Sequence, residues 1–380
     1  MGLLLFAAGW GANHFTTLLI VYRKSLGLAP SALGILFGVY ALGLVPGLIL
    51  AGRASDRWGR RALTLRASVI ALLASGLLAF GARGFGILLV GRFLYGLGMG
   101  AVMSPGSVWI QELSPPGRGA RRATLALSAG FGFGPLVSGL IAQFAPAPMV
   151  TPYVVHLLVL GIALFRVRSV SETAPRLSAH AGPVAAPVSQ AGVPPSDLTV
   201  LIELLPAAPW AFGFAAVTMV VLPGLMRPLV AYPVLYSGLV ILTTLSVGVS
   251  VQPFVARIGR SADLVGLLTG ALGIFVGSRA AALSSPGLVF VAAGLAGAGY
   301  GLVMTSGLVE VAGRVAGHAR GTAVGVYYVL TYVGFSLPFV HAVVSRHVGD
   351  VATLALMALT AVGCLLARAA VKRRRRPAGA

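Results

Sequence analysis

The feature that most constrains this chain is a series of long apolar runs, each near the length that crosses a bilayer. About 20 apolar residues in a helix span the hydrocarbon core, where a helix satisfies its own backbone hydrogen bonds. Only 9% of the 380 residues are charged, whereas soluble domains carry about 25%. We place twelve runs, at residues 3–22, 31–52, 63–81, 86–110, 123–145, 150–168, 207–226, 231–254, 262–282, 286–310, 320–343 and 350–370. The predicted fold class is therefore an all-α membrane protein with twelve transmembrane helices.

Lys and Arg residues divide unevenly between the two sides of these runs. If the N-terminus lies inside, 21 of the 28 fall in inner loops or the C-terminal tail and 6 at outer ends. Positive residues accumulate on the cytoplasmic side, so we expect both termini to be cytoplasmic. The excess of Arg over Lys and the many Ala and Gly residues suggest a GC-rich bacterial genome. We therefore expect a multi-pass protein of the bacterial inner membrane.

The net charge of +20 first suggests a nucleic-acid partner, but the basic residues lie in short loops between apolar runs. We expect no nucleic-acid partner, and we interpret the tail 372–380 as an anchor on the anionic inner leaflet. Cys364 is the single cysteine, and we find no metal-ligand spacing, nucleotide-binding glycine loop or nucleophile paired with a base. We therefore expect no cofactor, no metal and no enzyme activity.

A segment rich in Pro, Ala, Ser and Gly divides the runs six and six. We interpret residues 169–206 as a flexible cytoplasmic linker between an N-terminal bundle, 1–168, and a C-terminal bundle, 207–371. The halves resemble each other at an offset near 200, since Asp56–Arg60 aligns with Ala256–Arg260 and Gly96–Ser104 with Gly297–Thr305. Two parallel six-helix halves are typical of transporters with a site between the halves.

Three short motifs carry a resemblance to a known family. Gly52–Arg61 is similar to the loop 2–3 signature of the major facilitator superfamily, and Gly91–Gly100 resembles its fourth-helix motif. Gly130–Gly139 resembles the fifth-helix motif of its proton-coupled drug antiporters, with Ser138 where that motif favours glycine. The resemblance implies twelve helices in two pseudo-symmetric bundles that work by alternating access. It also implies an antiporter-type hinge, formed by Gly130, Gly134, Pro135 and Gly139.

Charged residues at the inner ends of the spans are the candidates for a cytoplasmic gate. Asp56 lies just before the third span, where the helix dipole favours a carboxylate, and the resemblance implies that it latches the two halves. Glu112 and Glu310 occupy mirrored positions and are gate charges or surface caps. The alternative for the arginines is simple anchoring at the inner leaflet. The gate candidates are Gly52, Asp56, Arg57, Gly59, Arg60, Arg61, Glu112, Arg121, Arg122, Glu310 and Arg320.

Polar and aromatic residues inside the spans are the candidates for solute binding and ion coupling. Arg92 lies inside the fourth span, where an arginine usually faces a partner or cavity; its alternative is to reach the outer surface. All eight acids lie at span ends or in loops, so His14 is the best proton carrier, unless a neighbour merely holds it neutral. The candidates are Asn13, His14, Arg92, Tyr95, Phe131, Trp210, Tyr236, Tyr300, Met304 and Tyr327.

The function predicted from these features is secondary active transport, with export of a small hydrophobic or amphiphilic compound. Aromatic and Met side chains suit apolar or weakly cationic solutes. Coupling to protons and facilitated diffusion both stay open, and we expect a monomer. One alternative is a facilitator or importer of a small metabolite, and another is a membrane sensor or scaffold that transports nothing.

Overall fold

The computed structural model describes residues 1–115, 118–173, 195–315 and 320–374. Within these ranges, nothing is described of the side chains at 52–53, 56–57, 120, 195–197 and 320–322. The chain divides into two compact units. The first contains Met1–Val184 and Ala231–Leu242, and the second contains Ala185–Val230 and Thr243–Ala380.

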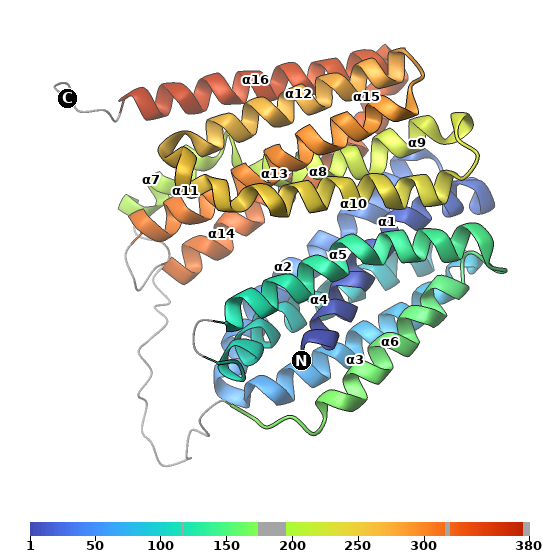
Figure 1. Ribbon diagram of the computed structural model, residues 1–380, viewed down its shortest axis with the longest axis vertical. Coiled ribbons are helices and arrows are strands. Elements are labelled where there is room, and N and C mark those ends of the chain that lie inside the picture. The colour runs from blue at the N-terminus through green and yellow to red at the C-terminus, as the bar shows by residue number, and fades with distance from the viewer. Residues whose placement is uncertain (116–117, 174–194, 316–319, 375–380) are drawn as a thin grey trace. The chain divides into compact units, whose positions relative to one another are not determined.

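The first unit is built from long helices joined by short connections (Figure 1). They are α1 (Gly2–Leu26), α2 (Pro30–Trp58), α3 (Arg60–Ala79), the short η1 (Gly81–Arg83), α4 (Phe85–Glu112), α5 (Gly119–Phe144) and α6 (Thr151–Val167). The closest pairs are α2 with α4, α1 with α5, and α3 with α4. The fourth helix therefore lies between the second and third.

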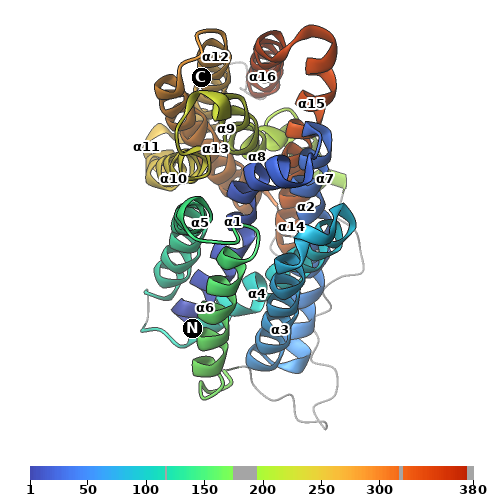
Figure 2. The same ribbon diagram turned by 90° about the vertical axis from the view of Figure 1, so that its right-hand side faces the viewer.

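The second unit begins with α7 (Pro195–Leu204) and continues with a broken span, α8 (Ala208–Ala216), η2 (Val217–Val221), α9 (Leu222–Met226) and η3 (Arg227–Leu229). Next come α10 (Pro233–Val251), whose first part, up to Leu242, belongs to the first unit, then η4 (Gln252–Phe254), α11 (Val255–Ile258), η5 (Gly259–Ser261), α12 (Ala262–Ala282) and α13 (Pro286–Arg314). The last are α14 (Arg320–Tyr332), η6 (Val333–Ser336), α15 (Leu337–Val348) and α16 (Asp350–Arg374). Helices α12 and α16 lie side by side (Figures 1 and 2).

The π-helical turn η2 interrupts the seventh predicted span. Pro223 follows it and has no backbone N–H to donate to the preceding turn, so it explains why regular α-helix breaks here. Such turns often occur at functional sites.

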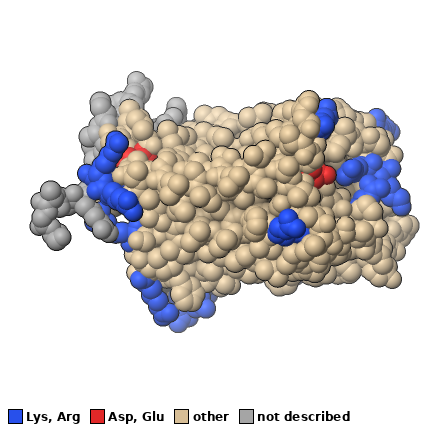
Figure 3. Space-filling view, turned by 90° about the horizontal axis from the view of Figure 1, so that it is seen from above, with Lys and Arg blue, Asp and Glu red and all other residues tan. Residues whose placement is uncertain are grey.

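Helix lengths and hydropathy match a membrane protein. Among the described residues, ten stretches are long and apolar enough to cross a bilayer. One of them, Pro233–Ala282, contains both α10 and α12, and the shorter α6 is also apolar. On the face drawn in Figure 3, most Lys and Arg side chains gather near the two ends. The predicted all-α membrane fold is therefore confirmed.

Two predicted connections are different in the structure. The charged stretch 52–61 is not a loop, because α2 runs on to Trp58 and α3 begins at Arg60. Gly59 alone joins them with a φ of 93°, a value that side chains other than glycine rarely adopt. The predicted linker 169–206 contains helix α7, because Val200, Leu201 and Leu204 bury one face of it. Residues 174–194 of that linker lie outside the described residues.

Glycines allow the central helices to approach their neighbours in the same way in both units. A Cβ on Gly100 of α4 would lie 2.3 Å from the carbonyl oxygen of Leu44 in α2. A Cβ on Gly301 of α13 would lie 2.0 Å from the carbonyl oxygen of Gly248 in α10. These two glycines are equivalent in the internal repeat, so the repeat preserves close backbone packing.

Candidate functional site

Arg92 is the central charged group inside the first unit. Its side chain is only 1% exposed. Nη1 donates to the carbonyl oxygen of Ala12 at 3.1 Å and Nε to that of Leu36 at 3.4 Å. The guanidinium carbon lies 4.4 Å from the ring centre of Phe15 and 4.5 Å from that of Tyr40. Arg92 therefore does not reach the surface, and carbonyl dipoles and aromatic faces stabilise its charge.

Neutral polar side chains surround this arginine on α1, α3, α4 and α6. His156 Nε2 donates to the carbonyl oxygen of Ala7 at 3.0 Å, and its Nδ1 is hydrogen-bonded to the Ser75 hydroxyl at 2.8 Å. The Tyr95 hydroxyl donates to the carbonyl oxygen of Ala8 at 3.1 Å. Both ring nitrogens of His156 are thus hydrogen-bonded, and sequence analysis did not select this residue.

His14 has a different environment. It is fully buried, and neither ring nitrogen has a hydrogen-bond partner among the described residues. Its ring centre lies 4.9 Å from that of His156 and 4.8 Å from that of Tyr153. A buried polar group without a hydrogen-bond partner destabilises the folded state by about 1–3 kcal/mol. Packing alone therefore does not explain why a histidine occupies this position. The predicted neighbour Asn13 instead donates to the carbonyl oxygen of Phe131 at 3.4 Å.

The hinge candidates of α5 pack tightly on α1. A Cβ on Gly130 would lie 2.1 Å from the carbonyl oxygen of Phe6, and one on Gly134 would lie 2.6 Å from the Trp10 Cα. The Trp10 indole nitrogen donates to the Ser138 hydroxyl at 2.8 Å. A glycine offers no such acceptor, which gives the departure at Ser138 a structural reason.

The gate candidates of the first unit lie around the start of α3. Glu172 accepts hydrogen bonds from the backbone N–H groups of Arg60 and Arg61, at 2.9 and 3.0 Å. Its carboxylate thus sits at a helix N-terminus, where the dipole favours it. Arg60 also forms an ion pair with Glu112 at 3.6 Å. Sequence analysis did not select Glu172.

Several gate candidates cannot be assigned contacts. The side chains at 52, 56, 57 and 320 lie outside the described residues, so the latch at Asp56 stays a prediction. Arg121 and Arg122 are exposed, and Arg122 donates to the Ser114 hydroxyl at 3.4 Å.

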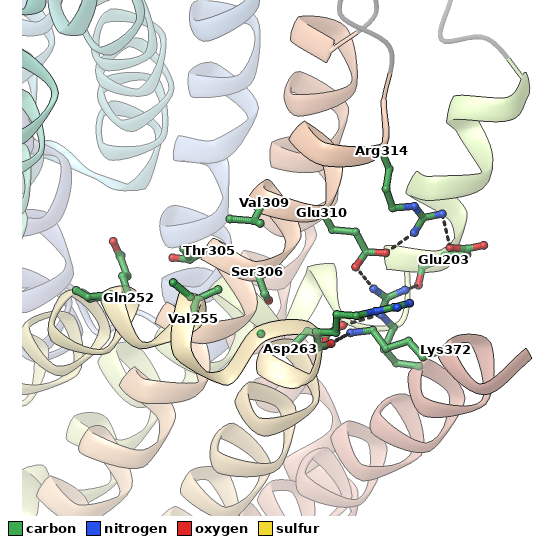
Figure 4. A pocket seen from close by; sticks show the side chains of 15 residues that line it. Glu203, Gln252, Val255, Asp263, Thr305, Ser306, Val309, Glu310, Arg314 and Lys372 are labelled. Atoms are coloured by element: carbon green, nitrogen blue, oxygen red, sulfur yellow. Dashed lines mark hydrogen bonds and ion pairs between the residues drawn. The ribbon is translucent and has the colours of Figure 1, made fainter. Parts of the chain in front are cut away.

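A larger charge cluster lies in the second unit (Figure 4). Arg368, only 1% exposed, donates from Nε to Asp263 at 2.7 Å and from Nη1 to the carbonyl oxygen of Glu203 at 2.9 Å. Its Nη2 bonds Glu310. Arg314 bridges Glu310 and Glu203, the latter at 2.9 Å, and Lys372 pairs with Asp263. These six residues, the charge cluster, tie α7, α12, α13 and α16 together.

Of this cluster, sequence analysis selected only Glu310. A usable signal was present, because Arg368 lies within the predicted span 350–370 as Arg92 lies within its own. The internal repeat gives a second signal, since Arg368 and Lys372 align with Arg168 and Glu172 at the same offset.

Aromatic rings gather in the second unit on α8, α13, α14 and η6. Phe212 stacks on Tyr332 at 4.7 Å and on Tyr300 at 5.7 Å between ring centres. Phe335 meets Phe212 edge-on at 5.2 Å. All four rings, the aromatic cluster, are half-buried. Such stacking offers a large apolar surface with polar hydroxyls at its edges.

Of the remaining solute candidates, Phe131 on α5 is half-buried and the other four are buried. Trp210 stacks on Phe214 at 5.1 Å, and the Tyr327 hydroxyl donates to the carbonyl oxygen of Val303 at 3.0 Å. Tyr236 and Met304 are also buried. The structure therefore places Tyr300 in the aromatic cluster and the four buried candidates, Trp210, Tyr236, Met304 and Tyr327, in packed positions.

A family model described as Major Facilitator Superfamily matches residues 1–339. The chain is 38% identical over 78 residues to the Multidrug resistance protein MdtL of Klebsiella pneumoniae, which is 20% of each chain. It is 32% identical over 123 residues to the Putative metabolite transport protein YncC of Bacillus subtilis, covering 32% of this chain and 26% of that one. It is 27% identical over 136 residues to the Quinolone resistance protein NorA of Staphylococcus aureus, covering 35% of each.

These alignments cover between 20% and 35% of the length of the curated relatives. Solved structures match over nearly the whole chain. A POT family transporter in complex with 5-aminolevulinic acid has a TM-score of 0.79 at 13% identity, covering 98% of this chain and 96% of that one. The nucleoside transporter NupG has a TM-score of 0.75 at 12% identity, covering 97% and 96%. Identities this low show a shared fold alone.

Proposed function

Because the chain belongs to the major facilitator superfamily of membrane transporters, we propose that it exports small hydrophobic or amphiphilic compounds by alternating access. The family and its transporter relatives make it a transporter and not an enzyme. The uneven distribution of Lys and Arg supports a bacterial inner-membrane location with both termini cytoplasmic.

The aromatic cluster carries this proposal. The rings of Phe212 and Tyr300 are stacked and half-buried. Phe212 lies on α8, which leads directly into the π-helical turn η2, and Tyr300 lies on α13. Aromatic faces bind apolar solutes and pay little entropy on ordering, because each side chain has only two rotatable bonds. The eight acids of the sequence lie at span ends or in loops, so the rings are not expected to act together with a carboxylate that selects a cation.

Export is supported by the tight seam between α1 and α5 and by two relatives. Gly130 and Gly134, which resemble the antiporter hinge, contact the backbone of α1 closely. MdtL and NorA carry names that describe drug resistance.

His14 is the proposed coupling group. A fully buried imidazole without hydrogen-bond partners among the described residues can accept a proton without breaking an existing bond. The rings of His156 and Tyr153 lie against it, and the cation of Arg92 repels a second positive charge at this position. In the proposed transport cycle, His14 therefore takes up a proton only in a conformation that admits water or solute.

Metabolite transport is the second candidate, because YncC is named as a putative metabolite transport protein. Counterflow into proteoliposomes of the purified full chain separates the two. Chloramphenicol, a neutral amphiphile, is expected to exchange, whereas glucose and quinate are expected to match protein-free liposomes. Exchange of glucose or quinate but not chloramphenicol would favour the metabolite candidate. No exchange of any of the three would favour a sensor or scaffold.

The aromatic cluster is tested by Phe212→Ala, with Phe144→Ala as the matched control. Phe144 is 61% exposed at the end of α5 and lies outside the cluster. We expect Phe212→Ala to lower chloramphenicol counterflow at least fivefold and Phe144→Ala to leave it within twofold. Equal effects of the two substitutions would remove the cluster from the proposal.

A further inference from the structure

A cavity of about 720 Å³ lies beside the charge cluster, with all of its lining residues in the second unit. Pockets that hold drug-sized molecules range from about 300 to 1,000 Å³. The wall is contributed by α13, α16, the end of α7 and the connection from α10 to α12. The cavity is thus large enough for a ligand, and no residue of the first unit is needed to form it.

The lining has two chemically different sides (Figure 4). One side carries charge, from Glu203, Asp263, Glu310, Arg314 and Lys372. The other side is apolar or neutral, from Gln252, Val255, Thr305 and Val309. Val255 belongs to a buried core with Ala262 and Leu302, whereas Val309 is 60% exposed. A molecule with one charged end and an apolar body matches this division.

The sign of the charge follows from the lining residues. Four bases, Arg260, Arg314, Arg368 and Lys372, face three acids, Glu203, Asp263 and Glu310. Each acid is already paired: Asp263 with Arg368 and Lys372, Glu310 with Arg314 and Arg368, and Glu203 with Arg314. A fully ionised lining therefore has a formal excess of one positive charge, and it favours an anion.

The hydrogen-bond donors support the same sign. A guanidinium has five N–H donors and an ammonium has three. Arg314 uses two of its donors and Lys372 uses two of its three, among contacts of the described residues. The exposed Arg260 side chain makes no hydrogen bond to any described residue. Donors thus remain for phosphate or carboxylate oxygens, which arginine binds well.

We propose that this cavity binds an anionic amphiphile, with a phosphate or carboxylate held by Arg260 and Lys372 and an apolar body against Val255 and Val309. A membrane phospholipid and a soluble amphiphilic anion share this chemistry. This binding site is separate from the proposed export of a hydrophobic compound. Binding of an anionic amphiphile in the cavity does not depend on which solute is transported, and it can be measured without transport.

The test uses the purified full chain in dodecyl maltoside, titrated with n-decyl phosphate. We expect n-decyl phosphate to bind at least tenfold more tightly than inorganic phosphate and than decyltrimethylammonium. Arg260→Gln removes the cation that pairs with no described residue, and Val309→Trp fills the apolar side. Each is expected to weaken n-decyl phosphate binding at least fivefold.

Two matched controls lie outside the cavity. Arg257→Gln changes another exposed arginine of the same connection, and Val291→Trp changes another exposed valine of α13. Both are expected to alter binding less than twofold. If a test variant and its control weaken binding equally, or if decyltrimethylammonium binds as tightly as n-decyl phosphate, the proposal is wrong. If circular dichroism shows that Val309→Trp is unfolded, the proposal is judged from n-decyl phosphate binding by Arg260→Gln compared with Arg257→Gln.

Native mass spectrometry of the purified protein distinguishes the two sources. A phosphatidylglycerol adduct that Arg260→Gln loses and Arg257→Gln keeps identifies a phospholipid ligand. No adduct in the parent protein, together with n-decyl phosphate binding that depends on Arg260, identifies a soluble amphiphilic anion. An adduct that survives in both variants, without Arg260-dependent binding of n-decyl phosphate, overturns the site.

Discussion

The buried pair of Asp263 and Arg368 gives the sharpest stability prediction. Asp263 is 2% exposed, and its carboxylate accepts from Arg368 Nε at 2.7 Å, from Lys372 and from the N–H of Leu264 at 2.9 Å. Asp263→Asn keeps one oxygen for Leu264 but turns an NH₂ group towards a cationic donor. Two charge-assisted bonds are weakened, each worth about 1.5–3 kcal/mol.

Arg368 keeps Glu310 as a second partner in this variant, so the loss falls in the lower part of the range for a broken buried pair. We expect Asp263→Asn to lower the free energy of unfolding by about 3–4 kcal/mol. The assay is reversible unfolding by sodium dodecyl sulfate in mixed micelles, followed by tryptophan fluorescence and circular dichroism.

The matched control is Asp350→Asn. Asp350 is a 46% exposed acid at the start of α16 whose partner His341 lies 3.6 Å away. His341 is buried and carries a charge only when protonated, and the Asp350 carboxylate keeps access to water, so the control is expected to lose less than about 1 kcal/mol. The double variant Asp263→Asn with Arg368→Gln is expected to lose less than the two single losses together, by at least about 0.5 kcal/mol. Equal losses in Asp263→Asn and Asp350→Asn would refute the assignment of a buried network.

Three further predictions concern packing and the first unit. Gly301→Ala brings a Cβ within 2.0 Å of the Gly248 carbonyl oxygen and is expected to destabilise by about 1–3 kcal/mol, whereas Gly294→Ala, with nothing within 4 Å, is expected to be neutral or stabilising in the same unfolding assay. Arg92→Lys cannot bridge two carbonyls while lying between two rings, so chloramphenicol counterflow is expected to fall at least tenfold; the exposed Arg83→Lys should leave it within twofold, and equal effects would contradict this role. Ser138→Ala leaves the Trp10 indole without its acceptor and is expected to cost about 1–3 kcal/mol, so an unchanged free energy of unfolding would show that the bond contributes nothing.

Membrane spans were predictable because lipid imposes both length and hydropathy on a helix. The ninth span was predicted at 262–282 and is α12, Ala262–Ala282, and the sixth differs from α6 by one residue at each end. The connection at 52–61 was not predictable in this way. Charge density shows that a segment leaves the hydrocarbon, but a helix continues into water as readily as it ends there.

The partners of the charged residues were harder to predict than the spans. In the sequence, Arg368 was counted only among the basic residues of the inner side and Asp263 only among the acids at span ends or in loops, because charges at helix ends are usually solvated. Their burial depends on α7 and α16 meeting α12, which is a tertiary contact that local sequence does not encode. It was easier to predict that Arg92 contacts a partner, because an arginine deep in a span needs one wherever the helix packs.

The most direct test of the account is chloramphenicol uptake by proteoliposomes with an imposed pH gradient, acidic inside. Export coupled to proton entry predicts accumulation inside above the equilibrium level, abolished by a protonophore and reduced at least fivefold by His14→Ala. Protein-free liposomes set the baseline. Uptake that only equilibrates, with or without the gradient, would contradict proton coupling, and uptake equal to protein-free liposomes would contradict export of a hydrophobic compound altogether.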